Sequence, residues 1–279
     1  MRWSKGRRST NIEDRRGGRR FGRTAGIGGG AAILAAIAVA ILGGDPSQVI
    51  EMMGDGQGGG EQQIQTSPEE EQVKDFLSVV LADTEDTWGP IFQQAGGTYQ
   101  APDLVLYRES TPTACGQGQA AAGPFYCPGD RKLYLDLGFL NEMKRMGAEG
   151  DFAVAYVIAH EVGHHIQTLV GTADKVRQMQ AQSNQTQSNQ IQVRMELQAD
   201  CFAGVWAHHA QKQRQILEPG DIEEGIRAAA SVGDDHLQRM SGRRVVPEAF
   251  THGSSEQRMD WLKRGLQTGN VQACNTFDA

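Results

Sequence analysis

The length and composition of this chain allow one fair-sized domain with appendages, or two small domains, because it has 279 residues of which 39% are hydrophobic. The formal net charge of −7 hides an asymmetry: residues 1–23 carry nine Lys and Arg against two acidic residues, which leaves a net charge of −14 on the rest. A basic arm alone is typical of nucleic-acid-binding tails, but so acidic a remainder argues against a nucleic-acid partner.

Residues 24–44, TAGIGGGAAILAAIAVAILGG, contain no charged side chain. This length is enough to cross a bilayer, which takes about 20 helical residues. Basic residues before the segment and Asp45 after it predict a cytoplasmic N-terminus. We therefore predict a basic cytoplasmic arm over 1–23, a single-pass anchor in the cell membrane over 24–44, and an extracytoplasmic remainder, periplasmic or at the cell surface. The alternative is a cleaved signal peptide, since AVA at 38–40 resembles a cleavage site; export follows either way.

The four cysteines agree with export, since none lies in a Cys-x-x-Cys pair of the kind found in zinc ribbons and redox motifs. Cys115 and Cys127 flank a loop rich in Gly and Ala, and a disulfide between them would stabilise the fold by roughly 2–3 kcal/mol. Cys201 and Cys274 are left to pair by elimination. The alternative for Cys201 is a buried free thiol.

The predicted elements begin after residues 45–67, a stretch rich in Gly and Gln that predicts a flexible linker. Ser67 is the expected N-cap of a first helix, with Pro68 at its first position and three Glu in its first turn. Apolar residues at helical spacing continue this helix.

Strands are predicted at 103–108 and 131–139, the second with alternating Leu and polar residues typical of a half-buried, possible edge strand. The polar tract 178–192 predicts a solvated helical extension or a loop. Helical patterns dominate the remainder: they cover about 139–147, 150–170, 193–214, 220–240 and 254–267. We therefore predict an α+β fold over 68–279, mostly helical with a small β-sheet.

The string HEVGHH begins at His160. Residues i and i+4 of an α-helix lie about 40° apart, so His160 and His164 share one face while His165 points away from His160. Glu161 lies next to the pair. His-Glu-x-x-His on a helix is typical of two zinc ligands with a general base beside the first. The apolar run FAVAYVIAH predicts that this helix is buried.

A third ligand is expected on another segment, because catalytic zinc usually has three protein ligands and one open position. Glu196 and Asp200 are again spaced i and i+4, within the apolar sequence LQADCFAGVWA. A buried acid pair needs a cation or hydrogen-bond donors. Glu196 is therefore a candidate Zn²⁺ ligand, and Asp200 a candidate acceptor for the far nitrogen of a ligand histidine. The alternative is a solvated helix face.

Four segments together resemble the bacterial neutral zinc metallopeptidase family: TACGQGQAAAGPFYCPGDRKLYLDLGF, AHEVGHHIQ, ELQADCFAG and FTHGSSEQRMDWL. The likeness covers roughly residues 68–275 and includes the basic arm and the membrane segment. His-Glu-x-x-His followed by Glu-x-x-x-Asp is also similar to the gluzincin pattern. The resemblance implies a membrane-anchored, zincin-like peptidase. The implied site residues are the ligands His160, His164 and Glu196, the base Glu161, and Asp200 behind the ligands.

The same resemblance implies that the strand at 131–137 borders the cleft, where an extended peptide could add as a further strand. THGSSEQR loosely resembles the His-Pro-x-x-x-x-Arg segment of prenyl-protein-protease-like relatives, with Gly253 in place of proline. His252 is therefore a candidate oxyanion stabiliser, and Arg258 a candidate brace for the acids. The alternative for His252 is a surface loop histidine.

The function hypothesis is zinc-dependent hydrolysis of a peptide or protein substrate, with Glu161 as general base. The alternative is a zinc-stabilised envelope binding or scaffold protein without turnover. A structural zinc ion usually has four protein ligands, many of them Cys, and no open position. The two histidines and one glutamate of this sequence therefore disfavour the alternative. No oligomeric state is predicted.

Overall fold

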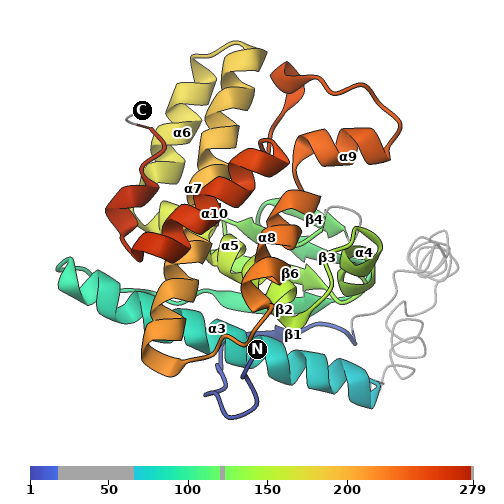
Figure 1. Ribbon diagram of the computed structural model, residues 1–279, viewed down its shortest axis with the longest axis vertical. Coiled ribbons are helices and arrows are strands. Elements are labelled where there is room, and N and C mark those ends of the chain that lie inside the picture. The colour runs from blue at the N-terminus through green and yellow to red at the C-terminus, as the bar shows by residue number, and fades with distance from the viewer. Residues whose placement is uncertain (18–65, 120–122, 278–279) are drawn as a thin grey trace, which may run out of the picture. The chain divides into compact units, whose positions relative to one another are not determined.

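The computed structural model describes residues 1–17, 66–119 and 123–277, and Figure 1 shows how they are arranged. The predicted transmembrane segment at 24–44 lies outside the described residues, as does almost all of the predicted linker at 45–67. In the part of the chain that is described, no helix is both long enough and apolar enough to cross a membrane.

The main sheet has four strands in the order β1, β2, β6, β5. These strands are Ile12–Asp14, Asp103–Tyr107, Lys132–Asp136 and Phe125–Cys127. The first three are parallel, and β5 runs antiparallel to β6. A separate antiparallel pair is formed by β3 (Ser110–Thr113) and β4 (Gly116–Gln119).

Strand β6 is an inner strand, which corrects the prediction of a possible edge. Leu133, Tyr134 and Leu135 are each 1% exposed, so both faces of the strand are covered. The leucines belong to the main core, and Tyr134 to a smaller cluster on the opposite face. The alternation of Leu with polar residues predicted a half-buried strand, whereas both faces of β6 are buried. Strand β5 occupies the edge instead.

The helices make up most of the domain, so the α+β prediction is confirmed. Among the described residues the α-helices are α3 (Pro68–Gln94), α4 (Phe139–Arg145), α5 (Asp151–Leu169), α6 (Thr172–Ala181), α7 (Gln185–Arg214), α8 (Asp221–Ser231), α9 (Asp234–Met240) and α10 (Ser255–Thr268). The 3-10 helices in this part of the chain are η2 (Pro247–Ala249) and η3 (Val271–Cys274). Ser67 caps α3 through a capping box with Glu70, as predicted from the sequence.

Helix α7 packs against α5 on one side and α10 on the other, and α5 also contacts β5 and β6 (Figure 1). The predicted helix at 220–240 is two helices, α8 and α9, separated at Gly233. A Cβ at this position would lie 2.4 Å from the backbone nitrogen of Ser255, so the chain turns where the start of α10 comes close. The polar tract 178–192 is mostly helical, at the end of α6 and the start of α7.

Both disulfides predicted from the sequence are present. Cys115 joins Cys127, which ties the loop containing β4 to β5. Cys201 joins Cys274, which ties η3 to α7. The alternative of a free Cys201 thiol is therefore wrong.

Residues 1–16 belong to the domain, which corrects the predicted division at residue 23. Met1–Arg16 and Thr66–Ala279 form one compact unit. Strand β1 pairs with β2 in a register that places Ile12 opposite Leu104. The segment is part of the sheet rather than a free arm.

The arginine side chains of this segment have acidic partners within the same unit. Arg7 lies 2.8 Å from Asp86 on α3, and the buried Arg16 guanidinium lies 2.6 Å from Asp14. The α-ammonium group of Met1 lies 2.6 Å from Asp151, the first residue of α5. Arg7 and the α-ammonium group of Met1 thus pair with acids that are distant along the chain.

Candidate metal centre

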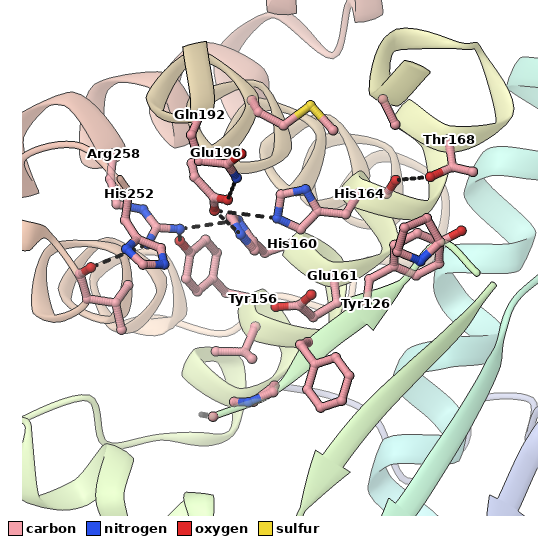
Figure 2. Close-up of a pocket in the computed structure, with 18 of the residues that line it drawn as sticks. Tyr126, Tyr156, His160, Glu161, His164, Thr168, Gln192, Glu196, His252 and Arg258 are labelled. Carbon is pink, nitrogen blue, oxygen red and sulfur yellow. Dashed lines mark hydrogen bonds and ion pairs between the residues drawn. The ribbon is translucent and has the colours of Figure 1, made fainter. Parts of the chain in front are cut away.

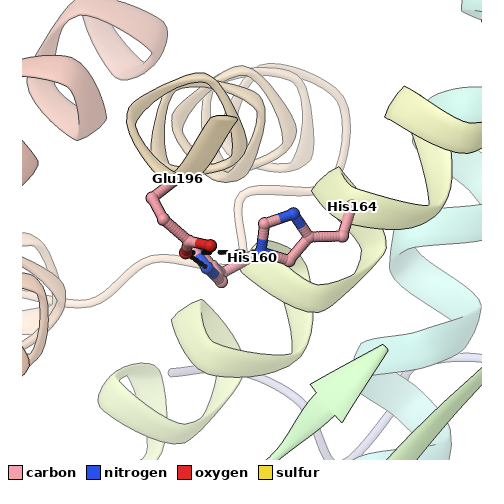
Figure 3. Close-up of side chains that lie close together, drawn as sticks. All are labelled: His160, His164 and Glu196. Atoms are coloured by element: carbon pink, nitrogen blue, oxygen red, sulfur yellow. Dashed lines mark hydrogen bonds and ion pairs between the residues drawn. The ribbon is translucent and has the colours of Figure 1, made fainter. Parts of the chain in front are cut away.

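Three side chains that were predicted as zinc ligands meet between α5 and α7 (Figure 3). Oε2 of Glu196, on α7, lies 3.2 Å from Nε2 of His160 and 3.4 Å from Nε2 of His164, both on α5. One ligand atom from each residue lies within 4.8 Å of the others. The three groups are close enough to bind one metal ion.

The two helices can approach this closely because α5 carries Gly163 between the ligand histidines. A Cβ at Gly163 would lie 2.9 Å from Cα of Ala199 and 3.0 Å from its carbonyl oxygen, too close for any side chain. Ala199 stands between Glu196 and Asp200 on α7. The contact of glycine with alanine therefore brings the acidic pair against the histidines.

The ring of His160 is oriented by Asp200, as predicted. Nδ1 of His160 lies 2.8 Å from Oδ1 of Asp200, whose side chain is fully buried. Arg258 donates from Nε and Nη2 to the two carboxylate oxygens, at 2.8 and 2.9 Å, and the hydroxyl of Tyr156 donates at 2.5 Å. Arg258 therefore braces the acid, as the resemblance implied. The apolar run of α5 gave no reason to single out Tyr156.

The charged groups of the cluster depend on one another. Burial lowers the pKa of His160, but the carboxylates of Asp200 and Glu196 outweigh it and raise that pKa to about 9. Burial works against ionisation of Glu196 too, yet the neighbouring imidazoles of His164 and His160 hold the pKa of its carboxyl well below the usual value. Two buried carboxylates thus lie beside the imidazoles, an environment that attracts a cation.

The residues fit a zinc ion. Two imidazoles and one carboxylate, with a further position open, are the ligand set of catalytic rather than structural zinc sites. Gln192 donates from Nε2 to Oε1 of Glu196 at 2.8 Å, which leaves Oε2 facing the histidines (Figure 2). Asp200 accepts from Nδ1 of His160, which leaves Nε2 free to bind the metal.

Glu161 faces a cleft of about 690 Å³ that is also lined by the three ligand residues. The residue is 8% exposed, and its carboxylate has no hydrogen-bond partner among the described residues. Figure 2 shows it on the cleft side of α5, near the ligands. A buried carboxylate without a fixed partner beside a metal-binding group is available to exchange a proton with a molecule in the cleft.

His252 lines the same cleft at its rim (Figure 2). Its side chain is 51% exposed, and its Nδ1 lies 3.2 Å from Oδ1 of Asp234. Gly253 has a φ of +89°, which a proline cannot adopt because its ring fixes φ near −65°. The departure from His-Pro therefore follows from the local backbone. The structure places His252 within reach of the cleft but not among the ligands.

His165 is turned away from the ligands, as its helical position predicts. Its Nε2 lies 2.6 Å from the carbonyl oxygen of Gln100, and its ring packs edge-on against Tyr99 and Tyr126. Burial lowers the pKa of His165 to about 4, so this imidazole is neutral at pH 7. It packs against the two tyrosines and lies outside the candidate ligand set.

Comparison with known proteins identifies the family of this chain. The family model described as "Putative neutral zinc metallopeptidase" matches residues 1–277. The chain belongs to this family. It is 49% identical to "Uncharacterized protein YpfJ" of Escherichia coli strain K12, over 99% of both chains. It is 41% identical to "Uncharacterized protein Mb2605" of Mycobacterium bovis, over 65% of this chain and 64% of the relative. No solved structure matches.

Proposed function

We propose that this protein hydrolyses peptide bonds with a zinc ion held by His160, His164 and Glu196. The observation that carries the proposal is Glu161, a buried carboxylate without a hydrogen-bond partner among the described residues, which faces the cleft beside a set of three ligand groups. Membership of a zinc metallopeptidase family supports the same reaction. The zincin-like character of the fold is part of this proposal.

A bound zinc ion would lower the pKa of water and polarise the scissile carbonyl. Glu161 accepts the proton of the attacking water and returns it to the departing amine. His252 donates a hydrogen bond to the oxyanion that develops on the carbonyl oxygen, which requires its ring to move inward from the cleft rim. Asp200, held by Arg258 and Tyr156, keeps His160 in the tautomer that binds metal.

The substrate that suits this cleft is an extended peptide. The edge strand β5 contributes Phe125 and Tyr126 to the lining, and its outer edge offers backbone groups for a further strand. The apolar side chains Phe139, Val157 and Met195 also line the cleft, and they favour apolar residues near the scissile bond. The resemblance implied the strand at 131–137 for this role, but β5 covers that strand.

Glu161→Gln is the test of the proposal. The amide cannot accept the proton, so we expect turnover of a proteome-derived peptide library to fall at least about 10³-fold, while zinc content stays at one ion per chain. Equal cleavage by the purified variant and the wild type would exclude Glu161 as the base. Stoichiometric zinc without cleavage of any peptide by the wild type would favour the scaffold alternative. The full chain is needed, because β1 belongs to the domain.

The membrane segment at 24–44 and the extracytoplasmic location remain predictions, because that segment lies outside the described residues; the pairing of β1 with β2 requires residues 1–16 to lie on the same side of the membrane as the rest of the domain. The two disulfides support an oxidising compartment.

A further inference from the structure

His164 is held by a residue not singled out from the sequence, Gln167, one helical turn further along α5. Oε1 of Gln167 lies 2.8 Å from Nδ1 of His164, and Gln167 is 0% exposed. The other ligand histidine, His160, is held instead by the carboxylate of Asp200. Two ligands on the same helix thus have partners of different charge.

The carboxamide of Gln167 has only one orientation that satisfies its neighbours. Its Nε2 donates to the carbonyl oxygen of Met195 at 2.8 Å and to Oε1 of Gln198 at 3.1 Å. Nε2 of Gln198 donates in turn to the carbonyl oxygen of Cys274 at 3.1 Å. Carbonyl oxygens only accept, so each NH₂ group must face them and each Oε1 must face the other way.

This chain of donors determines which nitrogen of His164 carries the proton. Oε1 of Gln167 can only accept, so Nδ1 of His164 must donate. In the neutral imidazole the lone pair then lies on Nε2, the atom 3.4 Å from Oε2 of Glu196. This series of hydrogen bonds begins at a fixed point, because the Cys201–Cys274 disulfide ties the Cys274 carbonyl to α7.

We propose that Gln167 is a positioning residue for the zinc ligand His164, and that Gln198 and the disulfide-tethered Cys274 fix its carboxamide. The proposal rests on the proposed function only in requiring zinc at His160, His164 and Glu196. It assigns the neutral partner Gln167 to His164, whereas His160 has the charged partner Asp200. Loss of such an outer partner typically costs 10–100-fold in metal affinity.

Two variants of the full chain separate positioning from packing. Gln167→Met keeps the length of the side chain but cannot accept a hydrogen bond. Gln167→Glu keeps the acceptor but loses the NH₂ group that bonds to Met195 and Gln198. Both variants should lower the melting temperature of the metal-free protein. Only Gln167→Met should weaken zinc binding, by about 10–100-fold in competition with a chromophoric chelator, and shift the visible spectrum of the Co²⁺-loaded protein.

Equal loss of zinc affinity in both variants would show a merely structural role and overturn the proposal, as would unchanged affinity in Gln167→Met. Should Gln167→Met fail to fold, the zinc-loaded wild type gives the answer by long-range ¹H–¹⁵N correlation. A proton on Nδ1 of His164 supports the proposal, and a proton on Nε2 overturns it. If the wild type binds no zinc, the proposed function falls together with this inference, whereas the other adverse outcomes leave that function intact.

Discussion

The candidate metal centre and the contact of Arg7 with α3 both join a basic group to a carboxylate, but at opposite depths. Side chains of Arg258 and Asp200 are 4% and 0% exposed, whereas those of Arg7 and Asp86 are 47% and 42% exposed. A buried ion pair is costly to break because one charge is left without water or partner, while an exposed pair contributes little. Charge content alone therefore does not reveal what a basic residue does.

The largest expected effect comes from deleting residues 1–16. The deletion removes β1 from the sheet and uncovers the surface that packs Met1, Trp3 and Ile12 against the core. Burial of a large apolar side chain contributes about 1.5–3 kcal/mol, so we expect a loss of roughly 5 kcal/mol, much of a typical domain's stability. Urea unfolding of the shortened and full chains measures this difference. Equal urea midpoints would mean that residues 1–16 do not stabilise the domain, as expected for the separate basic arm predicted from the sequence.

The same packing makes a prediction about membrane topology. A single crossing by residues 24–44 would put residues 1–16 and the rest of the domain on opposite sides, where β1 could not pair with β2. We therefore expect Ser4→Cys and Ser241→Cys, both at exposed positions, to react alike with a membrane-impermeant maleimide on intact cells. Opposite labelling would show that the predicted single crossing holds in the cell and that β1 is not paired there.

Next in size is Arg258→Met, which leaves the buried Asp200 carboxylate without its bidentate partner. Breaking a buried pair costs about 3–5 kcal/mol, so a clear fall in the urea midpoint is expected. In the double variant with Asp200→Leu we expect part of this stability to return, because no unpaired acid remains. Zinc affinity of the double variant should be lower than that of the wild type, because Nδ1 of His160 no longer has the carboxylate of Asp200 as its hydrogen-bond acceptor. Additive losses in stability would show that the two residues act independently.

The predicted side chains that the structure brings together follow local spacing. His160, His164, Glu196 and Asp200 are each set by an i, i+4 pattern within apolar sequence, and helical geometry alone places each pair on one face. The other contacts of the site depend on tertiary packing. Gln167 shows no pattern of its own, because the contacts that orient its carboxamide come from Met195 and Gln198 on α7.

The fold divides in the same way. The helices and the strands β2 and β6 were evident from periodicity, but the edge position of β5 depends on strand order, which periodicity does not encode. The pairing of β1 with β2 joins segments about 90 residues apart in the chain. Nine basic residues near the start are equally consistent with a free arm and with a segment neutralised by a distant acidic helix.

The smallest expected effect is that of Arg7→Ala. This side chain contacts Glu85 and Asp86 at the surface, where water and salt screen the charges. We expect a loss of less than about 1 kcal/mol, and the difference from the wild type should shrink further in 1 M salt. The effect of Arg258→Met should change little with salt, because its charges are out of reach of solvent ions. The salt dependence of the stability loss in each variant therefore shows how far solvent ions can reach each ion pair. Equal salt dependence would mean that the two ion pairs are exposed to the same degree, contrary to the burial that separates the Arg258–Asp200 pair from the Arg7–Asp86 pair.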